Sequence, residues 1–164
     1  MSVDASALEP YGWSPFFQET WRARASKESE EPARIIAEYR GGYVLFSAHG
    51  ELKAGVTGKL RRSIRQGESE RPTVGDWVAI EARPQEGSAV ILSVLPRRTR
   101  LVRKAAGRQD EEQVVASNVD IVFLVSALTR ELNPRRLERY LALAGNSGAQ
   151  PVVVLTKADL SEDP

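Results

Sequence analysis

Five short runs of β-forming residues follow one another between residues 33 and 96, and they constrain the fold more than any other feature of the sequence. Turn-forming pairs such as Gly41-Gly42 and His49-Gly50 separate them. Gly55 and Gly58 lie inside the third run, where glycine often marks a bend that lets a sheet close on itself. Five strands in about 65 residues is the size of an OB-type barrel. We place the runs at residues 33–40, 43–48, 51–60, 76–82 and 87–95.

A long polar and basic stretch, residues 61–75, separates the third run from the fourth. A loop of this length inside a compact domain is typically functional or disordered. At its end, Arg71-Pro72 and Gly75-Asp76 are typical of turns, because proline fixes φ and aspartate hydrogen-bonds nearby backbone. We therefore predict an inserted loop, followed by Trp77 packed in the core or at the end of the barrel.

The character of the chain changes at residue 118. Residues 119–125 form a continuous apolar run, which is typical of a strand buried on both faces. Asn133-Pro134 marks a helix start, with a capping residue followed by proline at the first helical position. Residues 151–155 form a second apolar run. Strand, helix and strand within about 40 residues predict a βαβ unit with parallel strands.

A short polar motif, Thr156-Lys157-Ala158-Asp159, follows the second parallel strand directly. Ligands of α/β nucleotide-binding sheets bind beyond the carboxyl ends of the strands. A carboxylate there accepts hydrogen bonds from N1 and N2 of guanine, whereas adenine leaves it unpaired. The lysine stem covers the base while its ammonium stays in water. The alternative is a polar loop that only caps the strand.

Two patterns that usually accompany such a motif are absent from the sequence. There is no G-x-x-x-x-G-K-S/T loop to cradle phosphates and no D-x-x-G to hold a metal ion. Either the chain is not a G domain, or its order is permuted and the phosphate loop lies after Pro164. The end of the chain, two strands into a sheet, favours truncation.

Positive charge is concentrated in one part of a nearly neutral chain. The net charge is +1, but residues 53–108 hold thirteen lysine and arginine residues against five acidic ones. Such a segment favours a surface that faces a polyanion, and a solvated face without a partner is the alternative. Tyr43 and Phe46 are possible base-stacking residues, although a place in the core fits their strand better. The candidate RNA contacts are Lys59, Arg61, Arg62, Arg65, Arg97, Arg98, Arg100, Arg103 and Lys104.

The amino-terminal residues 1–32 are predicted to form an extension and a linker. Trp13, Phe16, Phe17 and Trp21 fall at helical spacing, with Ser14 as cap, so we expect a short helix over residues 14–25. Its aromatic cluster is expected to pack on the following domain. Residues 26–32 are charged and lack large apolar side chains, which favours a linker.

Several classes of protein are excluded by what the sequence lacks. It has no cysteine, so it forms neither disulfides nor thiolate metal sites, and its lone His49 lies in a turn. No leader pattern is present, and no apolar run approaches the ~18 residues that a membrane span needs. We therefore expect a cytoplasmic protein without a metal site in this chain.

From about residue 33 onward the chain resembles the ribosome small-subunit-dependent GTPase A (RsgA) family of bacterial, circularly permuted GTPases. The combination of R-P-T-V-G-D-W-V at 71–78 with S-N-V-D at 117–120 and T-K-A-D at 156–159 is highly specific. Further matching stretches are residues 58–61, 95–98, 135–143 and 151–160.

The resemblance implies an OB barrel that contacts 16S rRNA, a permuted G domain and a carboxyl-terminal zinc domain. It implies guanine contacts at Thr156, Lys157 and Asp159, although Thr156 is asparagine in many members. GTP or GDP is the implied ligand, with Mg²⁺ and Zn²⁺ held only by parts of the family protein that have no counterpart here. The implied function is GTP hydrolysis coupled to late maturation of the small (30S) ribosomal subunit, by a monomer.

The predicted organisation is therefore an amino-terminal extension (1–32), an OB-fold RNA-binding domain (33–96), a basic linker (97–117) and the start of a truncated α/β GTPase domain (118–164). This fragment holds no catalytic residue and is expected not to hydrolyse GTP alone. One alternative is a standalone OB-fold RNA-binding module without nucleotide hydrolysis. An unrelated α/β enzyme is a weaker alternative, because the sequence shows no nucleophile–base pair or metal cluster.

Overall fold

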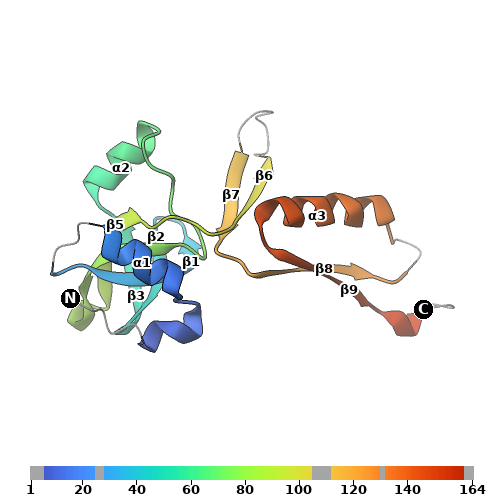
Figure 1. Ribbon diagram of the computed structural model, residues 1–164, viewed down its shortest axis with the longest axis horizontal. Coiled ribbons are helices and arrows are strands. Elements are labelled where there is room, and N and C mark those ends of the chain that lie inside the picture. Colours follow the sequence, from blue (N-terminus) through green and yellow to red (C-terminus); the bar gives the residue numbers. More distant parts are fainter. Residues whose placement is uncertain (1–5, 25–27, 105–111, 130–131, 161–164) are drawn as a thin grey trace. The chain divides into compact units, whose positions relative to one another are not determined.

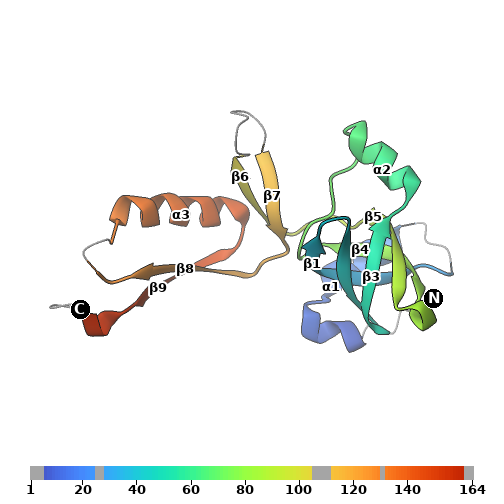
Figure 2. The ribbon, with the colours of Figure 1, turned by 180° about the vertical axis from the view of Figure 1, so that it is seen from behind.

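The structure, a computed structural model, describes residues 6–24, 28–104, 112–129 and 132–160. The chain forms two compact units, Met1–Arg97 and Arg98–Pro164, which we describe in turn (Figures 1 and 2). The strands of the first unit are β1 Glu31–Tyr39, β2 Gly42–Ser47, β3 Gly50–Val56, β4 Trp77–Arg83 and β5 Ser88–Val94. Its helices are η1 Ser6–Tyr11, α1 Pro15–Ala23, α2 Gly58–Arg65 and η2 Pro84–Glu86.

The five strands close into a barrel in the order β1-β2-β3-β5-β4, which confirms the predicted OB-type architecture. Most neighbours are antiparallel, and the parallel pair β3–β5 closes the barrel. Alternate residues of each strand face inward, as the two-residue period of a strand requires. The interior is filled by apolar side chains such as Ile35, Leu45, Leu52, Ile80 and Ile91.

The amino-terminal segment forms a second apolar cluster with the barrel. Leu8, Trp13, Phe17 and Trp21 pack against Trp77, Ala79 and Leu95. Trp77 and Ala79 are the alternate residues of β4 to Val78 and Ile80, so the start of β4 is buried on both faces. The predicted packing of the aromatic cluster is thus observed, except that Phe16 stays exposed. Ser14 is the cap residue of α1 but makes no side-chain cap hydrogen bond.

The third strand and the loop after it differ from the sequence prediction. The strand ends at Val56, and residues 58–65 form α2 instead of the end of a strand and the start of a loop. Thr57 caps this helix by accepting a hydrogen bond from the Leu60 N–H at 3.2 Å. Leu60 and Ile64, four residues apart, pack on the barrel core. Leu60 and Ile64 lie among five polar and basic residues, which is a weak periodic signal, so the sequence did not predict this helix.

In the second unit the strands are β6 Arg100–Lys104, β7 Glu112–Ser117, β8 Ile121–Ala127 and β9 Gln150–Thr156, and the helices are α3 Pro134–Ser147 and η3 Ala158–Leu160. Residues 97–117 therefore differ from the predicted basic linker, because β6 and β7 pair as an antiparallel sheet. In β6 only Leu101 and Val102 are apolar, and arginines flank them, so the sequence pattern did not indicate a strand.

The predicted βαβ unit is present. β8 and β9 pair in parallel, and α3 contacts both strands (Figure 1). Asn133 caps α3 with a hydrogen bond from the Arg136 N–H to its side chain at 3.1 Å, and Gly148 ends the helix in the left-handed region. The prediction that residues 119–125 are buried on both faces is wrong for this chain, since Ile121, Phe123 and Val125 are exposed. One helix covers only one face of a two-stranded sheet.

Candidate functional site

The motif Thr156-Lys157-Ala158-Asp159 begins at the carboxyl end of β9. Thr156 pairs with Ala127, the last residue of β8, so the motif lies where both parallel strands end. The Thr156 hydroxyl donates to the Ser126 carbonyl at 3.4 Å, and the Thr156 carbonyl accepts from the Leu128 N–H at 2.7 Å. These contacts tie the motif to the neighbouring strand. This edge is where open α/β sheets bind ligands.

The backbone turns sharply within the motif. Lys157 has a φ of 59°, in the left-handed region that is uncommon for residues other than glycine. The Leu160 N–H then donates to the Lys157 carbonyl at 3.1 Å, which closes the turn of η3. Backbone strain of this kind persists where a site requires a particular geometry. Thr156, Lys157 and Asp159 are all exposed, so a carboxylate and a long aliphatic stem are available to a planar base at this edge.

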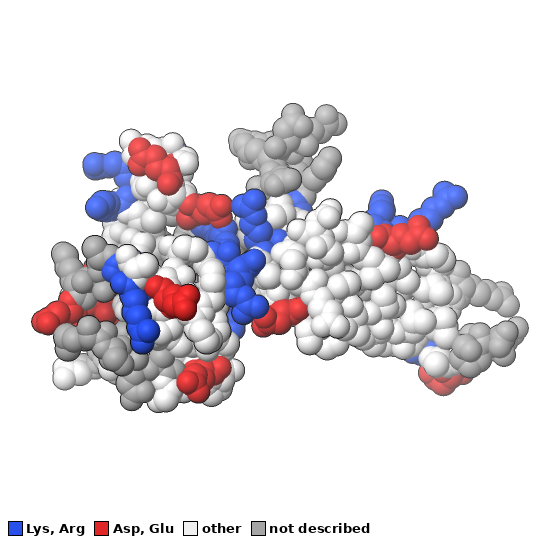
Figure 3. Space-filling model, viewed as in Figure 1, with Lys and Arg blue, Asp and Glu red and all other residues white. Residues whose placement is uncertain are grey.

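Four of the predicted RNA-contacting residues lie on α2, and we call them the α2 basic face: Lys59, Arg61, Arg62 and Arg65. All four side chains are exposed, and Figure 3 shows basic groups gathered over this helix. Within the described ranges none of the four forms an ion pair. Leu60 and Ile64 hold the opposite side of the helix on the barrel, so the cations face solvent.

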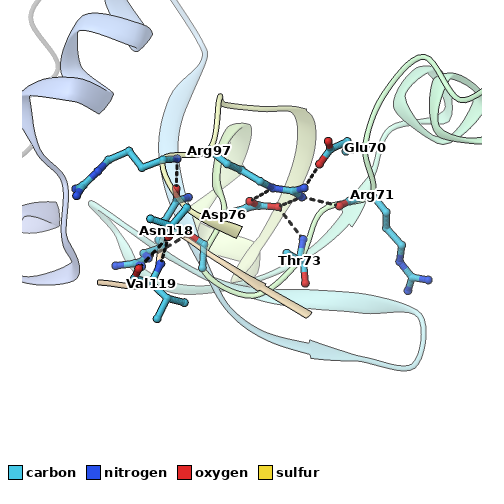
Figure 4. Close-up of polar contacts among 11 residues, drawn as sticks. Glu70, Arg71, Thr73, Asp76, Arg97, Asn118 and Val119 are labelled. Atoms are coloured by element: carbon cyan, nitrogen blue, oxygen red, sulfur yellow. Dashed lines mark hydrogen bonds and ion pairs between the residues drawn. The ribbon is translucent and has the colours of Figure 1, made fainter. Parts of the chain in front are cut away.

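Arg97, also predicted to contact RNA, has a different place. Its side chain is only 8% exposed, and its guanidinium donates to both oxygens of the fully buried Asp76 carboxylate at 2.7 Å (Figure 4). It also pairs with Glu70 and donates to the Arg71 carbonyl at 2.9 Å. A guanidinium engaged in this way is part of the structure of the barrel and does not project into solvent as the cations of the α2 basic face do.

Asp76 has a larger role than the turn predicted from the sequence. Its carboxylate accepts the Thr73 N–H at 2.9 Å, which is the expected turn contact, and also accepts both hydrogen bonds from Arg97. A buried carboxylate requires this kind of pairing to be stable. No local pattern connects two residues 21 positions apart, so the sequence did not reveal the pair.

The remaining basic candidates belong to the second unit. Arg98, Arg100 and Arg103 are exposed. Arg98 lies 3.4 Å from the Asp120 carboxylate, and Arg103 donates to the Gln113 side chain at 3.3 Å. Lys104 ends β6, and its side chain lies outside the described part of the structure. The basic residues that are adjacent in the sequence therefore divide between two units.

The two aromatic candidates on β2 do not have free rings. Tyr43 is buried in the barrel core. Phe46 is half-buried and stacks on Tyr11, with ring centroids 3.6 Å apart. The preference for a core position over base stacking is therefore correct for Tyr43, and the amino-terminal segment covers Phe46.

A polar network that sequence inspection missed connects the start of the second unit to β8. The Asn118 side chain accepts the Arg98 N–H at 2.8 Å, and the Thr99 hydroxyl accepts the Val119 N–H at 2.8 Å (Figure 4). Asn118 has a φ of 52°, which asparagine tolerates better than most residues. The S-N-V-D stretch thus sets the entry of the chain into the βαβ unit.

Two further observations concern the described residues only. No group of three or more histidine, cysteine, aspartate or glutamate side chains among them is placed to hold a metal ion. None of their helices is both long and apolar enough to cross a membrane.

Comparisons of the sequence and the fold with known proteins point to the same family of GTPases. The sequence profile of the RsgA GTPase family matches residues 94–164. A small ribosomal subunit biogenesis GTPase RsgA from Opitutus terrae is 48% identical over 95% of this chain and 44% of its own length. The protein of the same name from Xanthomonas oryzae pv. oryzae is 42% identical over 99% of this chain. The chain spans 44% of the length of either relative.

Two solved structures share the fold. YloQ, a circularly permuted GTPase, has a TM-score of 0.60 at 22% identity, covering 85% of this chain and 45% of its own. YjeQ from Thermotoga maritima has a TM-score of 0.61 at 24% identity, covering 81% of this chain and 43% of its own. The chain is therefore similar to RsgA GTPases over nearly its whole length, and the family resemblance seen in its sequence is confirmed.

Proposed function

We propose that this chain supplies the guanine-recognition and rRNA-contacting parts of a GTPase that acts in the biogenesis of the small ribosomal subunit. The observation that carries the proposal is the position of the Thr156-Lys157-Ala158-Asp159 motif at the carboxyl edge of the β8–β9 sheet. The names of the relatives support it. Because the chain spans less than half of their length, the GTPase reaction itself belongs to the proposal.

Guanine is the base that this edge suits. The Asp159 carboxylate accepts from the N1 and N2 donors of guanine, and adenine offers neither. The aliphatic stem of Lys157 covers one face of the base. The Thr156 hydroxyl, bonded to the Ser126 carbonyl, keeps β8 and β9 in register beneath the base. GTP and GDP share these groups, so both are expected to bind.

The chain contributes base recognition rather than phosphate chemistry. Its sequence contains no phosphate-binding G-x-x-x-x-G-K-S/T loop, and phosphoryl transfer depends on such a loop with its lysine and Mg²⁺. Without cysteine it also offers no thiolates to Zn²⁺. We therefore expect no GTP hydrolysis by the 164-residue chain alone, and we assign no step to either metal ion.

The α2 basic face is the proposed contact with 16S rRNA. Its four cations project from a short helix that two apolar residues hold on the barrel. Each arginine or lysine that neutralises a phosphate releases counterions, so affinity should fall steeply with salt. A complex with the small ribosomal subunit also places the protein in the cytoplasm.

The guanine site is tested by titrating the chain with GDP and ADP while recording amide NMR spectra. We expect GDP to shift the amides of residues 156–160 and ADP to leave them unchanged. Asp159→Asn removes a charged acceptor worth about 1.5–3 kcal/mol, so GDP affinity should fall about 10- to 150-fold. Glu138→Gln, which removes an exposed acid from α3, is the control. Equal shifts with GDP and ADP would contradict guanine recognition.

The rRNA contact is tested by co-sedimentation with small ribosomal subunits at low and moderate salt. Replacing Arg61, Arg62 and Arg65 by alanine removes three phosphate contacts, so the logarithmic salt slope should shrink by about 2–3 units. Replacing Arg135, Arg136 and Arg139 on α3 removes the same charge from another exposed helix and should have little effect. Equal losses in both triple variants would show a nonspecific charge effect. Subunit binding without guanine recognition would favour an RNA-binding module.

A further inference from the structure

A pocket of about 340 Å³ lies beside the α2 basic face. Its walls come from the end of β1, the β1–β2 turn, the start of β2, the end of β3, α2 and Arg71. Figures 1 and 2 show α2 on the opposite side of the barrel from η1. Pockets of about 300–1,000 Å³ hold small organic ligands, and this one has the size of a single nucleotide.

The pocket contains an exposed aromatic ring in a defined position. Tyr39 is 46% exposed although it belongs to β1. Its ring lies against Gly42, where an added Cβ would be 2.7 Å from the tyrosine hydroxyl oxygen and 2.8 Å from the Ala54 carbonyl oxygen. Only glycine allows this close approach. The hydroxyl end of the ring thus packs against the barrel backbone at Gly42, while the exposed part is available to a planar ligand.

Three guanidinium groups and one carboxylate share the pocket with this ring. Arg61 and Arg65 reach it from α2, and neither has an ion pair or a side-chain hydrogen bond within the described residues. Arg71 is held differently, since it lies 2.5 Å from the Glu38 carboxylate. A hydrogen bond with Tyr43 and the charge of Glu38 raise the pKa of Arg71 above its usual value. The pocket thus combines two available cations with a surface ion pair.

We propose that this pocket binds one unstacked nucleotide of single-stranded RNA, with its base on Tyr39 and its phosphates at Arg61 and Arg65. Bases that leave the helical stack pack on aromatic rings, and arginines neutralise the phosphates beside them. The inference rests on the proposed contact with rRNA and assigns it a specific site. Duplex RNA keeps its bases stacked inside the helix, so it cannot fill a concave pocket of this kind.

Glu38 favours RNA over an acidic peptide as the occupant. Its carboxylate accepts hydrogen bonds from the amino and imino groups of a base, whereas the carboxylates of an acidic segment have no hydrogen to donate to it. An acidic peptide also gains little from an exposed tyrosine ring. The combination of ring, carboxylate and guanidinium groups matches the three parts of a nucleotide better than it matches a row of negative charges.

The experiment measures binding of a fluorescein-labelled hexanucleotide RNA to the 164-residue chain by fluorescence anisotropy. Stacking contributes about 1–3 kcal/mol per base, so Tyr39→Leu should weaken binding about 5- to 150-fold. Tyr39→Phe keeps the ring and should bind nearly as the parent chain does. Tyr140→Leu is the matched control, because Tyr140 is also 46% exposed but lies on α3. Thermal unfolding of each variant shows whether its fold is retained.

A hexanucleotide that carries 4-thiouridine then maps the contact by photo-crosslinking. We expect crosslinks to the peptide that contains Tyr39, and crosslinks only to peptides outside the pocket would overturn the inference. If Tyr39→Leu leaves hexanucleotide affinity unchanged while small subunits still bind through α2, the pocket is wrong and the proposed function stands. If neither RNA nor small subunits bind, the proposed function fails with it. Tighter binding of a hexaglutamate peptide than of RNA would assign the pocket to an acidic protein segment.

Discussion

Breaking the ion pair between Asp76 and Arg97 should cause one of the largest single losses of stability in the barrel unit. Three variants test this: Arg97→Ala, Asp76→Ala and the double variant. The Asp76 side chain is fully buried, and Arg97 donates two hydrogen bonds of 2.7 Å to it. Removing one partner of a buried pair leaves the other charge buried without its counter-charge, and this costs about 3–5 kcal/mol.

The two single variants should not be equivalent. Arg97→Ala takes two charge-assisted hydrogen bonds from the fully buried Asp76 carboxylate, so we expect a loss of about 5 kcal/mol. Asp76→Ala leaves Arg97 with Glu70 and the Arg71 carbonyl, so the loss should be nearer ~3 kcal/mol. The double variant should lose less than the sum by about 1–3 kcal/mol, because neither charge of the buried pair remains.

Urea unfolding followed by tryptophan fluorescence measures these losses for the barrel unit alone. All three tryptophans, Trp13, Trp21 and Trp77, lie in the first unit. Arg71→Ala is the control, because the Arg71 side chain is 69% exposed and surface pairs contribute about 0–1 kcal/mol. The reasoning is refuted if Arg97→Ala changes the free energy of unfolding no more than Arg71→Ala does, or if the double variant loses the full sum.

Two further predictions use neighbouring residues as their own controls. Phe17→Ala removes a side chain that is 1% exposed and packs near Trp13 and Trp77, so it should lower the free energy of unfolding in urea by about 3–5 kcal/mol. Phe16→Ala removes a side chain that is 41% exposed and should lower it by less than about 1 kcal/mol. Equal losses in the two variants would contradict the packing of α1. Gly148→Ala forces alanine to a φ of 83° and brings its Cβ to 3.3 Å from the Thr99 side chain, so it should destabilise the helix by about 1–2 kcal/mol. Gly145→Ala lies inside α3 with open space around it and should stabilise the helix by about 1 kcal/mol. Hydrogen exchange of the α3 amides measures the change in helix stability for both glycine variants. If both variants destabilise α3, or both stabilise it, the assignment of Gly148 as the left-handed cap is refuted.

The barrel strands and the βαβ unit were predictable because their signals are local. Alternation over five or six residues identifies a strand such as β5, and an apolar run followed by Asn133-Pro134 identifies a strand and the start of the next helix. The position of the Thr156–Asp159 motif after β9 follows from the same patterns. A weakly periodic segment such as α2 was not recognisable, since Leu60 and Ile64 acquire their meaning only from the barrel core that they meet.

The sequence by itself therefore determined the five barrel strands, the βαβ unit, the family resemblance and the place of the Thr156–Asp159 motif, all of which depend on neighbouring residues. Only the tertiary structure decided which charges are available to a ligand. Arg97 and Arg98 are adjacent in a basic run, yet Arg97 is buried against Asp76 and Arg98 is exposed. A charged side chain is buried only where the fold brings a partner to it. That partner lies 21 residues away, and the antiparallel pairing of β4 with β5 brings it into contact.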